Sequence, residues 1–211
     1  MHRAIAWLFI IVGTASAADV DSLIRELKDK DVEVRRAAAT RLGGLGPQAK
    51  AAVPALTAAL QDKDVFVRRF AAQALGEIGP EAKSAIPALV AALGDSRKEV
   101  VEAATRAVGK MGADGVNALV EIAKDKKRLA ATRQRAVAAL GMIGKEAKPA
   151  VPVLIEGLKD PAIRTEAANA LGALGPEAKE AVPALQEHVK DKDKVFRNSV
   201  VEALKRIQGK K

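Results

Sequence analysis

The sequence offers few residues that could carry out catalysis. It contains no cysteine and two histidines, and one of these, His2, lies in a segment that we expect to be removed. General acid–base catalysis and serine triads depend on a positioned histidine, and a chain without cysteine has no thiolate nucleophile or thiolate metal ligand. With His188 as the remaining histidine, the sequence predicts no catalytic residues and no enzymatic activity.

The strongest candidate for a metal site is His188 together with Asp191. One histidine and one carboxylate do not complete the coordination shell of a protein-bound metal, so we expect His188 to be a solvated surface residue. The glycines are spaced as helix ends and do not form the Gly-x-Gly-x-x-Gly loop that follows a strand and holds phosphate groups. The sequence therefore predicts no metal, no cofactor-binding residues and no cofactor.

The net charge of +9 raises the question of anionic partners. The positive charges are mixed with negative ones, as in the stretch 190–194, which is typical of solvated turns. Aromatic residues make up only 2% of the chain, so few side chains could stack on bases. These features argue against nucleic acid as a partner, whereas electrostatic attraction to an anionic surface polymer remains an alternative.

The N-terminal segment has the pattern of a cleavable signal peptide. Met1, His2 and Arg3 carry positive charge, residues 4–12 are apolar, and Ala15-Ser16-Ala17 has the small residues that a signal peptidase recognises. The apolar run is about half of the roughly 20 residues that a membrane-spanning helix needs. We expect cleavage after Ala17, no transmembrane span after cleavage, and an exported protein that is periplasmic or extracellular.

The rest of the chain is dominated by an internal repeat. A glycine marks its register at five places, with lysine at the sixth: Gly43, Gly76, Gly109, Gly141, Gly172 and Lys205. Between these markers lies a second unit with a Val-Pro or Ile-Pro dipeptide, in which proline suits the first turn of a helix. Gly-Pro after the marked segment ends a helix. A helix pair of this period is the signature of a solenoid.

The repeat therefore predicts an all-α fold, a solenoid of about six helix pairs. We expect a single repeat domain over residues 18–211, following a signal peptide at 1–17. The expected repeats are about 20–50, 51–83, 84–115, 116–148, 149–179 and 180–211.

Arginines recur four places after the expected start of all but one of the second helices. At 100° per residue, Arg68 lies about 40° from Asp64, beside Leu75 on the core side, where an unpaired guanidinium is unfavourable. We expect a structural ladder between adjacent repeats, made of Asp31, Arg35, Asp64, Arg68, Arg133, Asp160, Arg164, Asp193 and Arg197. An ordinary surface pair four residues apart is the alternative. Arg97, Val101 and Leu129 depart from the pattern and should interrupt the ladder.

The strings Asp-x-x-Val-Arg, Ala-Ala-x-Ala-Leu-Gly and Gly-Pro-x-Ala-Lys-x-Ala-Val-Pro resemble the HEAT-like repeats of the phycobilisome-lyase type. The resemblance covers nearly all of residues 20–208 and implies a right-handed α-α superhelix. Proteins with this repeat include chromophore lyase subunits, deoxyhypusine hydroxylase and scaffolds without catalytic activity. The hydroxylase resemblance implies several His-Glu pairs that bind two irons, but this sequence has one such pair, in reverse order, at Glu187-His188. A lyase acts inside the cell, whereas this chain is expected to leave it.

The face of each second helix opposite the core differs from copy to copy, and in a HEAT-like solenoid it resembles the concave surface. Phe66 stands out because it is an aromatic residue among arginines, as in the anchors of protein interfaces. We expect a protein-binding site made of Phe66, Arg69, Gln73, Glu99, Glu102 and Arg106. The alternative is a solvated face with Phe66 covered by the neighbouring repeat.

These features together indicate a non-catalytic scaffold of the bacterial envelope or exterior that holds a protein or peptide on its concave face. The alternative is electrostatic binding of an anionic surface polymer or nucleic acid. A lyase-like or hydroxylase-like repeat protein is a lower alternative, because the metal-site residues are absent.

Overall fold

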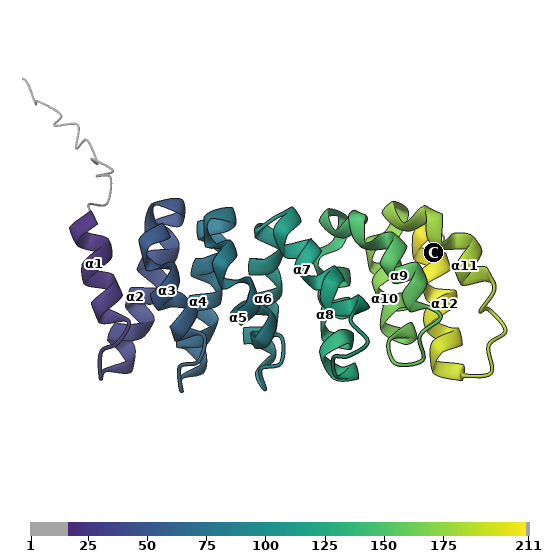
Figure 1. The fold of residues 1–211 in the computed structure, drawn as a ribbon, viewed down its shortest axis with the longest axis horizontal. Helices are drawn as coiled ribbons and strands as arrows, with labels where there is room; N and C mark the ends of the chain where they lie inside the picture. Colours follow the sequence, from purple (N-terminus) through teal and green to yellow (C-terminus); the bar gives the residue numbers. More distant parts are fainter. Residues whose placement is uncertain (1–16, 210–211) are drawn as a thin grey trace, which may run out of the picture.

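Residues 17–209 are described by the computed structural model, and within them every regular element is a helix. The helices stand side by side in one elongated row, with α1 and α12 at opposite ends (Figure 1). This arrangement confirms the predicted all-α solenoid. The expected signal peptide lies outside the described residues except for Ala17, where α1 begins.

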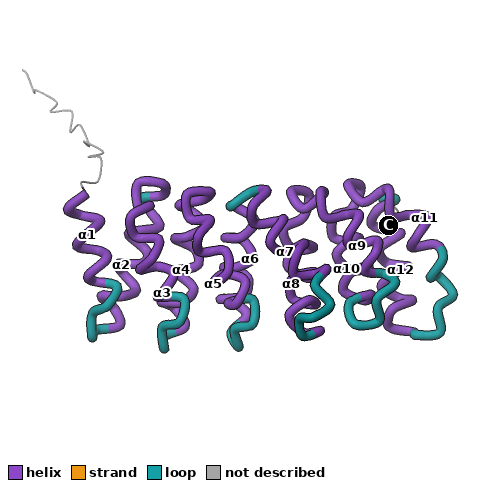
Figure 2. Tube along the Cα trace, viewed as in Figure 1, coloured by secondary structure: helices purple, strands orange, loops and turns teal. Residues whose placement is uncertain are grey.

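Each repeat consists of a first and a second helix. The first helices are α1 (Ala17–Glu26), α3 (Val53–Ala59), α5 (Ile86–Ala92), α7 (Ala113–Lys124), α9 (Val151–Gly157) and α11 (Val182–Gln186). The second helices are α2 (Val32–Gly44), α4 (Val65–Ile78), α6 (Lys98–Lys110), α8 (Ala130–Ile143), α10 (Arg164–Leu174) and α12 (Lys194–Ile207). Short 3-10 helices lead into four of the first helices: η1 (Gly46–Ala52), η2 (Gly79–Ala85), η3 (Gly144–Ala150) and η4 (Gly175–Ala181). The turns within the pairs lie along one edge of the row (Figure 2).

Local signals set the ends of the second helices. Asp64 caps α4, because its Oδ1 accepts hydrogen bonds from the backbone N–H groups of Phe66 and Val67, both at 3.0 Å. At the other end Gly79 has a φ of 72°, which glycine adopts without strain, and Pro80 follows it. Asp31 and Asp193 cap α2 and α12 in the same way as Asp64 caps α4.

Asp160 does not cap its helix. The N-cap of α10 is Ile163, and the carboxylate of Asp160 instead accepts a hydrogen bond from the N–H of Ala162 in the turn before the helix. In the corresponding turn before α4, the carboxylate of Asp62 accepts a hydrogen bond from the N–H of Asp64. The fifth repeat has one aspartate where the second has two, and that aspartate stabilises the turn rather than the helix end.

Neighbouring second helices pack directly on one another except at α6 and α8, whereas the first helices make sparse contacts with each other. Glycine allows the close approach. A Cβ atom added to Gly76 would lie 2.9 Å from the Cα of Ala107, and one added to Gly172 would lie 2.9 Å from the Cα of Ala203. The second helices therefore form the more closely packed layer, and in a curved solenoid that layer is the inner one.

The joint between the third and fourth repeats is built differently. In the described chain it has no 3-10 helix between α6 and α7, and α7 begins directly after Gly112. Gly115 packs against the end of α6, where an added Cβ would collide with the carbonyl oxygen of Val108. Within residues 17–209, no helix has both the length and the apolar character needed to cross a membrane.

Candidate functional site

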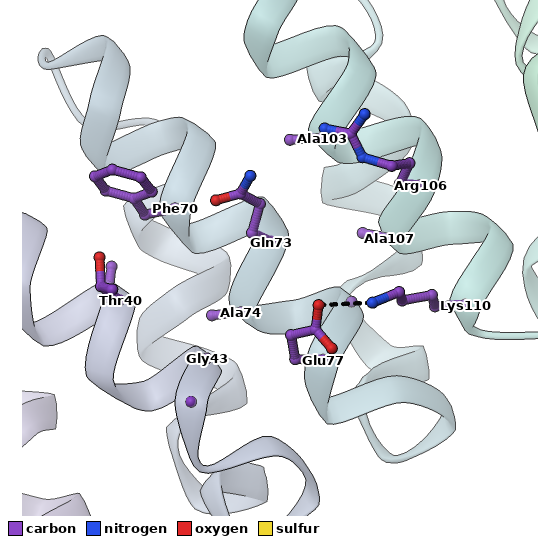
Figure 3. Close-up of a pocket in the computed structure, with 13 residues that line it drawn as sticks. Thr40, Gly43, Phe70, Gln73, Ala74, Glu77, Ala103, Arg106, Ala107 and Lys110 are labelled. Atoms are coloured by element: carbon purple, nitrogen blue, oxygen red, sulfur yellow. Dashed lines mark hydrogen bonds and ion pairs between the residues drawn. The ribbon is translucent and has the colours of Figure 1, made fainter.

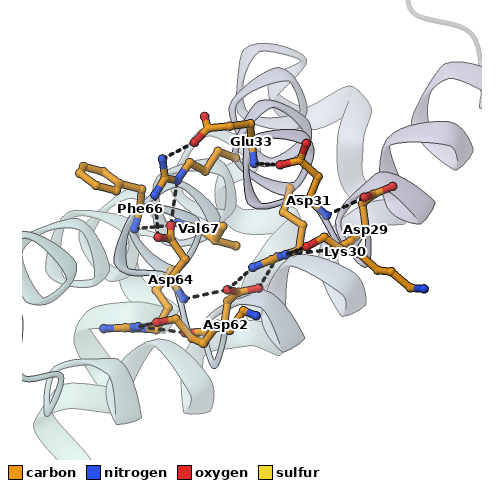
Figure 4. Close-up of polar contacts among 12 residues, drawn as sticks. Asp29, Lys30, Asp31, Glu33, Asp62, Asp64, Phe66 and Val67 are labelled. Atoms are coloured by element: carbon orange, nitrogen blue, oxygen red, sulfur yellow. Dashed lines mark hydrogen bonds and ion pairs between the residues drawn. The ribbon is translucent and has the colours of Figure 1, made fainter.

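Arg35 joins the first repeat to the second through a buried ion pair. Its side chain is only 6% exposed. Nε and Nη2 donate to the two carboxylate oxygens of Asp62 at 2.8 and 3.0 Å, and Nη1 donates to the carbonyl oxygens of Asp29 and Lys30 (Figure 4). This bidentate geometry fixes both turns in place.

The same bridge recurs along the row. The further bridges are Arg68 Nε to Asp95 Oδ2 at 2.7 Å, Arg133 Nη2 to Asp160 Oδ2 at 2.7 Å, and Arg164 Nη2 to Asp193 Oδ2 at 3.0 Å. In the bridges of Arg35, Arg68 and Arg133, the aspartate lies 27 residues after the arginine. Arginines therefore link adjacent repeats, as a ladder requires.

Arg133 and Arg164 bind the predicted aspartates Asp160 and Asp193, whereas the acidic partners of the first two arginines differ from those that we expect from the sequence. Arg35 and Arg68 bind the turn aspartates Asp62 and Asp95, not the helix-capping aspartates. The cap Asp64 instead accepts from Arg36, at 2.9 Å for Nε and 2.7 Å for Nη2. The sequence indicates these additional pairs through its Arg-Arg and Asp-x-Asp doublets, in which each arginine of one repeat can bind one aspartate of the next.

Two predicted members of the ladder form no bridge between repeats. Asp31 caps α2 and accepts from the N–H of Glu33. Arg197, in the last repeat, donates from Nη1 to the carbonyl oxygen of Asp191 in its own turn at 2.6 Å. In the third repeat, Val101 stands where the arginine would be. In the fourth repeat, Leu129 is the N-cap of α8 and makes no side-chain hydrogen bond there.

The bridges keep their aspartates ionised. The pKa of Asp64 is lowered to about 2, mainly by the hydrogen bond from Arg36 and also by the N–H groups of Val67 and Phe66. The pKa values of Asp95 and Asp160 are lowered mainly by the hydrogen bonds from Arg68 and Arg133, respectively. Hydrogen bonds to the charged form are the cause in each case.

An aromatic and arginine cluster lies on the second-helix face of α2 and α4. Phe66 is 42% exposed, and its ring centroid lies 6.3 Å from that of Phe70. The guanidinium carbon of Arg36 lies 4.7 Å from the centroid of Phe66, and that of Arg69 lies 5.2 Å from Phe66 and 4.6 Å from Phe70. The preceding repeat thus covers part of Phe66 through Arg36, and the rest of the ring is open to solvent.

Two hollows flank Phe70, and together we name them the α4 groove. The larger, of about 580 Å³, is lined by residues of α2, α4 and α6 that include Thr40, Phe70, Gln73 and Arg106. In Figure 3, Phe70 and Gln73 lie on the middle helix, with Thr40 on one side and Arg106 on the other. The smaller hollow, of about 380 Å³, shares Thr40 and Phe70 and adds Phe66 and Arg69.

The groove brings together four of the six residues that the sequence predicts for the site. Phe66, Arg69, Gln73 and Arg106 line it. Glu99 and Glu102 do not, and they pair with Arg97 at 3.5 Å and Lys98 at 3.4 Å on their own helix start.

Phe70 is the member of the groove that the sequence analysis does not select. Its position falls at the edge of the arc opposite the core, so helical periodicity alone does not assign it to this face. A signal exists, however, because the two neighbouring repeats have Ala37 and Ala103 at the same place. Ala37 lines the smaller hollow and Ala103 the larger. The two small side chains leave the space on either side of Phe70.

His188 is partly buried rather than solvated. Its ring lies 5.1 Å from that of Phe196, and Nδ1 lies 3.9 Å from Oδ2 of Asp191. Asp191 also lies 3.5 Å from Arg164. Among residues 17–209, no three His, Cys, Asp or Glu side chains gather where they could hold a metal ion.

Comparison with known proteins identifies the repeat. The sequence matches the family of HEAT repeats over residues 20–107 and 119–205, which leaves out the end of α6 and the start of α7. The match confirms that the sequence motifs are HEAT-like repeats. No curated protein matches the chain.

Several solved structures are similar to the chain. An engineered protein is 26% identical, with 90% of this chain and 97% of its own covered and a TM-score of 0.47. Human deoxyhypusine hydroxylase, in complex with glycerol, is 24% identical, with 93% and 86% covered and a TM-score of 0.44. A chain from the complex of CpcE and CpcF of phycocyanin lyase from Nostoc sp. PCC7120 is 20% identical, with 72% and 98% covered and a TM-score of 0.49.

Proposed function

Because the chain belongs to the HEAT repeat family, we propose that it is a non-catalytic scaffold that holds a protein or peptide in the α4 groove. The observation that carries this proposal is the groove itself, which spans three second helices and exposes part of an aromatic side chain, Phe66. Solenoids commonly use such extended inner surfaces for binding. Aromatic and arginine side chains contribute most to the affinity of protein interfaces.

The second-helix face is not uniform, and this supports placing the site in the first three repeats. Between α8 and α10 a smaller hollow of about 280 Å³ is lined mainly by small side chains, including Ala138 and Ala173, with Met142 at its edge. Its lining has no aromatic residue, and Glu166 is the one acidic or basic residue in it. The α4 groove, by contrast, combines apolar, aromatic and charged groups.

We also propose that the mature protein acts in the envelope or outside the cell. The support is the charge, apolar run and small-residue pattern of residues 1–17 in the sequence. N-terminal sequencing of the protein recovered from an extracytoplasmic fraction should find a chain that starts at Ala18. Recovery of an intact Met1 would contradict cleavage.

Electrostatic binding of an anionic surface polymer is a second candidate, and the bridges favour it. The aspartates of the turns, such as Asp62 and Asp160, bind arginines of the preceding repeat. Lysines of the same or equivalent turns, such as Lys63 and Lys192, are exposed. The turn edge of the row (Figure 2) therefore presents more positive than negative charge to solvent.

Site-specific photo-crosslinking of the mature protein in its own envelope fraction tests the groove. A crosslinking amino acid at Gln73, exposed in the groove, should capture a partner protein. The matched control is Asn117, which is exposed on the first helix α7. Equal capture from Asn117, or no capture from Gln73, would reject the groove as the binding site. Binding that is lost when turn lysines are changed to glutamine, but not when Phe66 is changed to alanine, would favour the anionic polymer.

A further inference from the structure

The carboxylates around the α4 groove are already paired. Glu33 accepts from Arg36 at 2.6 Å, and Glu77 accepts from Lys110 at 2.6 Å across the larger hollow (Figure 3). Glu99 and Glu102 pair with Arg97 and Lys98. The acidic groups of this face are therefore neutralised within the protein.

Two arginines that line the groove have no acidic partner among the described residues. Neither Arg69 nor Arg106 forms an ion pair or a side-chain hydrogen bond within residues 17–209. The pKa of Glu99 is lowered mainly by its own backbone N–H and by the charge of Arg97, and Arg69 adds only the smallest contribution. The ion pair of Glu99 is with Arg97. The groove consequently has an excess of positive charge on its lining.

Arg69 is also held in a fixed position. Its guanidinium stacks on Phe66 and Phe70, and its Nε is buried without a hydrogen-bond partner. A buried donor without an acceptor is unfavourable unless a ligand or water satisfies it. Stacking on aromatic rings orients a guanidinium, and its planar set of donors matches the two oxygens of a carboxylate.

Arg106 extends this pattern across the larger hollow. It is exposed on α6, one repeat after Gln73 at the equivalent place, and both line the hollow beside Phe70. The groove therefore offers one arginine on each side of an apolar surface made by Phe70, Ala74 and Ala103.

We infer that the α4 groove recognises an acidic peptide segment of a partner protein. Carboxylates of the peptide pair with Arg69 and Arg106, and an apolar side chain between them packs on Phe70. This inference rests on the proposed scaffold function and specifies the chemistry of the partner.

Fluorescence anisotropy with a defined probe tests the inference. The probe is a fluorescein-labelled peptide of alternating glutamate and leucine, and its counterpart has glutamine in place of each glutamate. Wild-type protein should bind the acidic peptide more tightly than the glutamine peptide. The Arg69→Gln and Arg106→Gln double variant should lose affinity for the acidic peptide by about tenfold or more, as expected for the loss of charge-assisted hydrogen bonds.

The matched control is Arg41→Gln with Arg206→Gln, which makes the same change in net charge at exposed arginines outside the groove. Equal weakening in the control would show that total charge, and not the groove, attracts the peptide. Equal binding of the glutamine peptide, or no binding of the acidic peptide to wild-type protein, would also overturn the inference. If Arg69→Gln impairs folding in a thermal melt, Arg106→Gln alone must still weaken binding, because Arg106 is exposed.

The two proposals fail in different ways. If Gln73 captures a protein partner while the peptide affinity is independent of both arginines, the scaffold function stands and acidic recognition is wrong. If Gln73 captures nothing, the scaffold function is wrong whatever the peptide binds.

Discussion

The joint between α4 and α6 and the joint between α6 and α8 are neighbours in the row, yet different contacts hold them. At the first, Gly76 meets the backbone of Ala107, and Arg68 bridges to Asp95. At the second, Gly109 faces the side chain of Ile143. Val101 occupies the position of the bridging arginine there.

The difference shows which contacts set the regular stacking of the repeats. The contact of glycine with alanine brings two neighbouring second helices close together. The arginine bridge joins the turns that precede the same two helices. The joints of α2 with α4, α8 with α10 and α10 with α12 repeat both contacts. The joint of α6 with α8 lacks both contacts.

Acid should have the largest effect, because it discharges the aspartates of all bridged joints at once. An unfolded aspartate titrates at about 3.9, whereas the pKa of Asp64 is about 2 and the pKa values of Asp62, Asp95 and Asp160 are lowered. Between these values the unfolded chain binds protons that the folded chain does not. The stability from these groups is therefore complete above about pH 5 and is lost as the pH falls toward about 2.

Urea unfolding followed by circular dichroism, from neutral pH down to about pH 2, measures this loss. Asp64→Asn should flatten part of the pH dependence. A urea midpoint that stays constant over the acidic range would contradict a role of the bridges in stability.

Removing one bridge should have the next largest effect. Arg35→Ala leaves the partly buried carboxylate of Asp62 and two carbonyl groups without their donor. Breaking a largely buried pair of this kind costs about 3 kcal/mol. Arg41→Ala is the control on the same helix, because its side chain is 62% exposed and lies 3.7 Å from Glu26. Its cost should stay within about 0.5 kcal/mol. Similar urea midpoints for the two variants would show that burial does not matter here.

The glycine contact can be tested by a pair of equivalent substitutions. Gly76→Ala places a Cβ 2.9 Å from the Cα of Ala107 and should destabilise by about 1–2 kcal/mol, since the backbone must move. Gly109→Ala meets Cγ1 of Ile143 at 3.2 Å, and a side chain can adjust. Because alanine favours helix, Gly109→Ala should be within about 0.5 kcal/mol of the parent. The comparison between the joints breaks down if Gly109→Ala is the more destabilising variant.

The smallest expected effect is a gain at the irregular repeat. Leu129 is 78% exposed at the N-cap of α8, with backbone angles of −57° and 138°. Leu129→Asp should provide the cap that Asp64 provides to α4, and stabilise the protein by about 0.5–1 kcal/mol. Leu129→Ala controls for removal of the apolar side chain. Equal thermal midpoints for the two variants would mean that a cap is not what this helix lacks.

Spacing in the sequence predicts the helix pairs, the buried stripe and the inward position of the arginines. These features depend on local geometry, such as the cap at Asp64 and the helical angle of Arg68. Which aspartate an arginine binds depends on which carboxylate of the next repeat lies within its reach. Periodicity shows that Arg68 points inward, but the turn before the next helix decides that it meets Asp95.

The α4 groove also has features that the sequence predicts and features that depend on contacts between repeats. The sequence identifies Phe66 and Arg69 because they lie opposite the core on one helix. The space around Phe70 depends on Ala37 and Ala103, which belong to different helices. A pattern within one repeat does not show a cavity that three repeats form together.

Each bridge runs from an arginine to an aspartate of the next repeat, so further repeats could be inserted into the row without loss of a bridge. The block Asp62–Gly94 contains the aspartate that the preceding arginine needs, and its own Arg68 needs the aspartate that begins the following block. A tandem copy inserted after Gly94 would place a second Asp62 where Arg68 now finds Asp95, and a second Ala74 where Gly76 now meets Ala107. Each inserted copy would also bring another Phe66 and Phe70 pair, so protein engineers could lengthen the molecule and multiply its aromatic and arginine clusters in one step.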